Sequence, residues 1–200
     1  MTFLVLAALA TGLGSRVDTS YGRVDGDIIL SFGLGTTITP RSPMGTIDLR
    51  ARYLDTAGVF VTYEEGFGGP AQPARVLVIG AEARPLFWVR WLADKEIGVP
   101  FVDLLIDSFA FELGVAMLQP QTGHFADRFA LQAGIGLEAP LFGRAQGLWI
   151  GLHGGARFSE IGLAWERQTA LEQSAYLAIT LSWHQPIKTH AVDIGDLRRE

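Results

Sequence analysis

Bulky apolar residues recur at every second position along most of this chain, with small or charged residues between them. In the clearest stretch, bulky side chains alternate with smaller ones from Ile28, Leu30, Phe32, Leu34 and Thr36 to Ile38. Alternation with a period of two places one residue set on each face of a β-strand. We count eight such segments: 25–38, 47–53, 59–64, 77–84, 109–117, 129–138, 148–158 and 177–184. The sequence therefore predicts an all-β fold of eight antiparallel strands.

The chemistry of the two strand faces predicts which one points outward. A soluble ligand-binding barrel also alternates, with its apolar face inside. Here glycine and alanine crowd the polar face, as a narrow eight-stranded interior requires, whereas a water-facing surface has no such volume limit. Hydrophobic residues make up 48% of the chain and charged residues only 18%. The longest apolar run, Phe3–Leu9, is too short for a membrane-spanning helix, which needs about 20 residues. We therefore predict an up-and-down transmembrane β-barrel with its apolar face outward.

The polar face of these strands carries acids and bases in nearly equal numbers. An unpaired charge in a constricted interior is costly, so we expect these side chains to pair with one another. A plug of polar side chains that pair with one another is favoured over a selective pore, because conducting channels generally need more strands. The predicted lumen network consists of Asp48, Arg50, Arg52, Glu64, Glu82, Arg84, Glu112, Glu138, His153 and Arg157.

Charge and composition exclude several classes of function. The net charge of −5 provides no basic face for nucleic acid. The chain has no cysteine, and its histidines have no metal-ligand spacing, so we predict no metal site and no cofactor. The sequence Gly33-Leu34-Gly35 lacks the third glycine and the following helix of a nucleotide-binding loop, and we interpret it as barrel packing.

The termini and one internal segment depart from the strand pattern. Residues 1–10 are interpreted as a signal-peptide remnant, because a short apolar core precedes Ala8-Leu9-Ala10; a buried plug or first strand is the alternative. Residues 11–24 form an N-terminal lead, 25–184 the barrel domain and 185–200 a polar C-terminal tail. Within 85–107, the aromatic stretch Leu86–Leu92 fits a short interfacial helix whose Arg90 snorkels, and equally another strand or a packed loop.

In architecture the chain resembles the bacterial outer-membrane β-barrel class, especially the small eight-stranded barrels, over residues 25–184. The resemblance rests on the repeated dyads. It implies a Gram-negative outer membrane, with its lipids, lipopolysaccharide and the barrel-assembly machinery as partners. Such barrels commonly end on an aromatic residue that the assembly machinery reads; Trp183 is well placed, but the tail continues beyond it. The loops 39–45, 66–74, 119–127 and 159–174 would face the exterior.

The predicted function is a non-enzymatic outer-membrane barrel with a structural, adhesive, or small hydrophobic-solute transport role of a porin-like kind. A soluble periplasmic lipid-binding barrel is the main alternative. A lipid A-modifying hydrolase is the third, because His153 lies on a polar strand face. Resemblance to outer-membrane lipid A deacylases would require a serine two residues after the histidine, but Gly155 stands there. No catalytic residue is therefore predicted.

Overall fold

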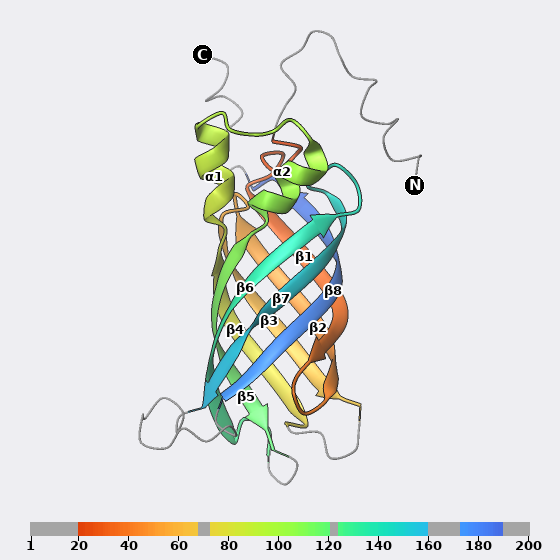
Figure 1. Cartoon of the computed structure of the whole chain (residues 1–200), viewed down its shortest axis with the longest axis vertical. Coiled ribbons are helices and arrows are strands. Elements are labelled where there is room, and N and C mark those ends of the chain that lie inside the picture. The colour runs from red at the N-terminus through yellow and green to blue at the C-terminus, as the bar shows by residue number, and fades with distance from the viewer. Residues whose placement is uncertain (1–19, 68–72, 121–123, 160–172, 190–200) are drawn as a thin grey trace.

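The chain forms a closed barrel of eight antiparallel strands, each paired with the next and β8 paired with β1 (Figure 1). The computed structural model describes residues 20–67, 73–120, 124–159 and 173–189. The strands are β1 (Ile28–Ile38), β2 (Pro43–Tyr53), β3 (Ala57–Gly66), β4 (Arg75–Ala83), β5 (Ala110–Gln119), β6 (Arg128–Pro140), β7 (Gly147–Ser159) and β8 (Gln173–Ile187). The predicted fold class and strand count are confirmed.

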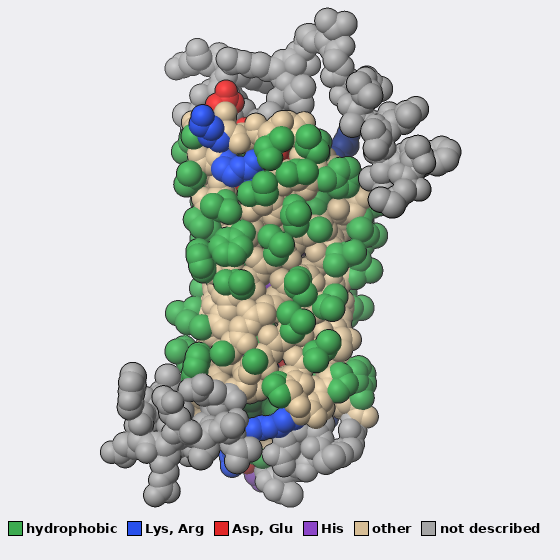
Figure 2. All heavy atoms as spheres, in the orientation of Figure 1, with side chains coloured by type: hydrophobic (Ala, Val, Ile, Leu, Met, Phe, Trp, Pro, Cys, Tyr) green, Lys and Arg blue, Asp and Glu red, His purple; other side chains and the backbone are tan. Residues whose placement is uncertain are grey.

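The apolar set of each strand covers the outside of the barrel. Phe32 on β1 is 49% exposed and Leu113 on β5 is 56% exposed, whereas their neighbours Ser31 and Glu112 are buried. Figure 2 shows the hydrophobic side chains spread over the barrel wall, with charged groups gathered at its two ends. The predicted orientation, apolar face outward and polar face inward, is therefore correct.

Two short helices, rather than one helix or a further strand, occupy the segment between β4 and β5. They are α1 (Pro85–Leu92) and α2 (Pro100–Asp107), and both lie over one end of the barrel (Figure 1). Each begins with a proline, whose fixed φ suits the first helical turn and whose missing N–H is not needed there. No helix among the described residues is long and apolar enough to cross a membrane.

The aromatic face of α1 packs on the chain rather than pointing away from it. Phe87 and Trp91 are buried and contact Val24 and Leu54. Leu54 belongs to the three-residue connection between β2 and β3, in which Leu54 and Asp55 both have positive φ and the Thr56 N–H donates to the Tyr53 carbonyl, as in a type I′ turn. The connection between the predicted segments 47–53 and 59–64 thus consists of residues 54–56, and β3 begins two residues before the predicted segment.

The barrel also extends beyond the predicted end of its last strand. β8 continues to Ile187, because Gln185, Pro186 and Ile187 lie opposite the first residues of β1. Residues 185–187, assigned to the polar tail, thus belong to the wall. Residues 1–10, residues 11–19 of the N-terminal lead and residues 190–200 lie outside the described residues.

The connections separate into two sets. The described N-terminal segment, the helices, and the β2–β3 and β6–β7 turns lie at one end, which we call the helical end (Figure 1). The other four connections, predicted to be exterior, leave and enter the strands at the opposite end, which we call the open end.

Candidate functional site

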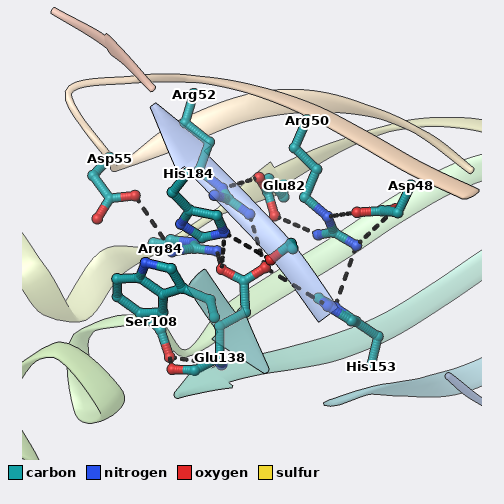
Figure 3. A network of polar contacts seen from close by, with 12 residues as sticks. Asp48, Arg50, Arg52, Asp55, Glu82, Arg84, Ser108, Glu138, His153 and His184 are labelled. Carbon is teal, nitrogen blue, oxygen red and sulfur yellow. Dashed lines mark hydrogen bonds and ion pairs between the residues drawn. The ribbon is translucent and has the colours of Figure 1, made fainter. Parts of the chain in front are cut away.

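The ten residues of the predicted lumen network all point into the barrel. They come from β2, β3, β4, β5, β6 and β7, with Arg84 just after β4, and every one is buried. Their inward position follows from the same alternation that exposes the apolar face. Figure 3 shows how the members nearest the helical end converge from different strands.

Arg50 is the centre of one cluster of charges. Its Nε lies 2.6 Å from Asp48 Oδ2, and its NH1 lies 2.7 Å from Glu82 Oε2 and 2.5 Å from Glu112 Oε1. Its guanidinium carbon also lies 5.2 Å from the centre of the Phe60 ring. One cation thus connects β2, β4 and β5 across the interior through charge-assisted hydrogen bonds.

Glu138 is the centre of a second cluster, closer to the helices. It accepts hydrogen bonds from Arg84 and, at 3.1 Å, from Arg52. Arg52 also donates to Glu82, at 2.5 Å, which joins this cluster to the first. The Ser108 hydroxyl donates to the Glu138 carbonyl and accepts from its N–H, so the end of α2 holds the backbone of β6 at this point.

Two histidines lie between these clusters. His153 Nδ1 is 2.8 Å from Glu112 Oε1 and its Nε2 is 3.7 Å from Glu138 Oε1, so Glu112 is its nearer carboxylate partner. His184, absent from the predicted network, is buried and stacks on Trp149 with ring centres 4.7 Å apart. Alternation along the segment 177–184 places His184 on the polar face. Because His184 ends that segment, its burial could not be predicted from the sequence.

A third group of charges, the pair of Arg157 and Glu64, lies toward the open end. Arg157 donates to both oxygens of Glu64, at 2.8 and 2.6 Å, and to Gln132 at 2.8 Å. Its guanidinium lies over the Tyr176 ring, with 4.8 Å between the guanidinium carbon and the ring centre. Glu64 also accepts from Thr37. The pair is therefore held from five strands.

Not all of the lumen is polar. A buried apolar cluster fills one part of it, formed by Met44, Phe60, Val76, Val78, Ala116 and Ala130. Among the polar side chains remains a cavity of about 10 Å³, bordered by residues that include Arg50, Glu112 and His153. That is room for about one water molecule.

The helical end carries a charge network that sequence periodicity did not reveal. Arg23, in the N-terminal lead, lies 2.6 Å from Asp107 and 3.7 Å from Asp55. Arg90 does not snorkel outward as expected; it lies 2.5 Å from Asp103 and 2.6 Å from Asp107. Asp103 and Asp107 lie one helical turn apart on α2 and both pair with Arg90, and only the fold brings Asp107 to Arg23.

Asp103 holds the connection between α1 and α2. Burial by itself would raise the pKa of Asp103, but hydrogen bonds from the Ile97 and Gly98 amides, the Tyr21 hydroxyl and Arg90 outweigh it and lower the pKa below its ordinary value. Burial and the bond to Asp103 raise the pKa of Tyr21. The charged form of Asp103 therefore stabilises this end.

The helical end is expected to loosen in acid. A carboxylate whose pKa is lowered by folding stabilises the fold above its unfolded pKa, near 3.8 here, and loses that effect as pH falls through the folded value. Protection of the Ile97 and Gly98 amides from hydrogen exchange should therefore fall at acidic pH. In the Asp103→Asn variant, the protection of these two amides should already be low at neutral pH. Asp94→Asn, an exposed acid of the same connection, is the control. Equal protection in both variants would contradict the assignment.

The lumen also contains a serine, histidine and glutamate whose geometry differs from a catalytic relay. His184 Nε2 lies 3.1 Å from Ser182 Oγ and 3.6 Å from Glu138 Oε2, so one nitrogen faces both partners. A relay uses the two nitrogens separately. A serine at position 155, two residues after His153, would place its Cβ 2.2 Å from the Ala133 carbonyl oxygen. The approach of β6 to β7 therefore excludes the serine position of the deacylase pattern.

The described residues contain no group of three or more histidines, cysteines or carboxylates that could hold a metal ion. The carboxylates in the lumen face guanidinium groups instead. What this arrangement does chemically is to neutralise charge inside a narrow barrel.

Comparison with known proteins adds little to this description. No family model and no curated protein matches the chain. Among solved structures, that of Neisserial surface protein A (NspA) is similar at 11% identity, covering 78% of this chain and 94% of that one with a TM-score of 0.35. A likeness this low indicates nothing about residues or role.

Proposed function

We propose that this protein is a non-enzymatic barrel of a bacterial outer membrane, with a lumen closed by its own ion pairs and a structural or adhesive role carried by its open end. The observation that supports this most directly is the combination of an apolar outer wall with buried ion pairs across the interior.

The outer wall favours a lipid environment over water. Monomeric soluble proteins rarely expose continuous apolar patches larger than a few hundred Å². Here the outward residues of all eight strands form an apolar surface around the barrel, with examples such as Val59 at 59% and Leu34 at 53% exposure. Burying that surface in hydrocarbon removes the cost of exposing it to water. A soluble lipid carrier would need the reverse arrangement.

The closed interior argues against conduction. Arg50, Arg52 and Glu138 reach partners on other strands, and the cavity among the polar side chains is about one water in size. A hydrated ion would have to break these contacts in order to pass. The role of the protein then depends on the residues exposed at its open end. Lipids, including lipopolysaccharide, surround the barrel, and the barrel-assembly machinery inserts it.

Two measurements test this proposal. The protein should remain in the outer-membrane fraction after carbonate washing and should migrate faster on a gel without heating than with it, because a closed barrel resists detergent unfolding. Release by carbonate would support the soluble periplasmic lipid-binding barrel and contradict the proposal.

In planar bilayers, the purified barrel is expected to give no discrete conductance steps, because its ion pairs fill the lumen. Carbonate-resistant insertion in vesicles of the same lipid is the control that the protein is present. Regular single-channel steps at neutral pH would overturn the closed-lumen part of the proposal and favour a porin-like transport role.

A further inference from the structure

We propose that the open end of the barrel is a binding site for a phosphate group, either free or carried on a lipid. A pocket of about 110 Å³ lies at the open end. Its polar lining consists of Thr39, Arg41, Arg128, Arg157, Ser159 and Ser174. The site is read from the barrel alone; only its exposure to the exterior rests on the proposed function.

The charge of this pocket differs from that of the lumen below it. Deeper in the barrel, guanidinium groups face carboxylates, as Arg50 and Arg52 do. The described residues that line the pocket include three arginines and three hydroxyl side chains, but no carboxylate. Arg128 forms no ion pair with any residue in the described part of the chain. Arg157 is itself paired with Glu64 below the pocket, so among the described residues three arginines face one carboxylate there.

The deepest arginine is already held in place. Arg157 is 5% exposed, and Glu64 and Gln132 fix its guanidinium while Tyr176 lies against its face. A guanidinium held in this way loses little conformational entropy when it binds an anion. Arg128, at the start of β6, is exposed and can contact the ligand from another side. Basic side chains are visible at this end of the molecule in Figure 2.

Size and shape select the ligand. Pockets that enclose a whole organic ligand have volumes of about 300–1,000 Å³. A volume of about 110 Å³ accommodates a single small anionic group instead. Planar guanidinium groups bind phosphate oxygens in pairs, and hydroxyl groups donate to the same oxygens. The apolar Leu118 and Ala130, which also line the pocket, leave room beside the anion for the first carbons of an attached chain.

The test uses the folded protein in a maltoside detergent, which has no phosphate of its own. Inorganic phosphate and, separately, dodecyl phosphate are titrated while the arginine Nε–Hε signals are followed by NMR. Saturable shifts of Arg157 and Arg128 are expected. Arg128→Gln should weaken binding at least tenfold. Arg75→Gln should leave it unchanged, because Arg75 is at the same end, outside the pocket, and paired with Glu65.

Each outcome decides the proposal. Saturation by inorganic phosphate identifies a free anion as sufficient, and saturation by dodecyl phosphate alone identifies a lipid-borne phosphate. No saturable shift with either probe, or a shift reproduced by sodium chloride at equal ionic strength, overturns the site. So does equal weakening by Arg75→Gln and Arg128→Gln. Heat-modifiable migration confirms that each variant is folded, and because binding is measured in detergent, it is independent of the membrane location and conductance tests.

Discussion

Glu138→Gln is expected to lower the free energy of unfolding by about 3 kcal/mol, the lower end of the cost of breaking a buried ion pair, because Arg52 and Arg84 keep Glu82 and Asp55 as partners. The substitution keeps the shape of the side chain but removes the negative charge between Arg52 and Arg84, both of which are buried. Urea unfolding in lipid vesicles, followed by tryptophan fluorescence, measures the change.

The matched control for this experiment is Glu65→Gln. Glu65 also pairs with an arginine, Arg75, but both side chains are about half exposed, where solvent screens the interaction. No resolvable change in the unfolding midpoint is expected there. If Glu138→Gln were as mild as this control, the ion pairs in the lumen would not be a source of stability.

Gly155→Ala is expected to prevent or strongly weaken closure of the barrel between β6 and β7. A Cβ at this position would lie 2.2 Å from the Ala133 carbonyl oxygen and 2.6 Å from the Gly134 Cα. Both atoms are backbone, so the two strands would have to separate. Overpacking of side chains alone costs about 1–3 kcal/mol, and loss of strand pairing adds to it. The readouts are loss of the fast-migrating unheated band and a lower urea midpoint.

The neighbouring glycine provides the control. A Cβ at Gly154 meets only the Leu177 Cδ1 at 3.4 Å and the Tyr176 carbonyl oxygen at 3.6 Å, which are near ordinary contact distances. Gly154→Ala should therefore fold, with a gain of up to about 1 kcal/mol from the stiffer unfolded chain. Comparable stability of the two alanine variants would show that β6 and β7 do not approach as closely as described.

The structure of the helical end could not be predicted from the sequence. The segment 85–107 fitted a helix, a strand or a loop equally well, because short apolar stretches have no decisive period. The two helices form because Phe87 and Trp91 find Leu54 and Val24, and because Arg90 finds Asp103. These partners come from the N-terminal lead, a hairpin turn and α2. No local pattern links them.

The lumen divides in the same way between local and distant causes. Alternation alone places Arg50, Glu82 and Glu138 on the inner faces, because side-chain direction in a strand depends only on position. Their partners depend on how strands distant in the sequence are staggered around the barrel, as in the contact between Arg52 and Glu138. His184 and Arg23 joined the charge networks for that reason, although no motif marked them.

By itself, then, the sequence determined the number of strands, the outward apolar wall and the set of charges enclosed, since a period of two is a local property of the chain. Only the tertiary structure decided which charge meets which, how α1 and α2 cover one end, and where three arginines gather at the other. Those features depend on barrel closure and stagger, which bring together residues that are far apart along the chain.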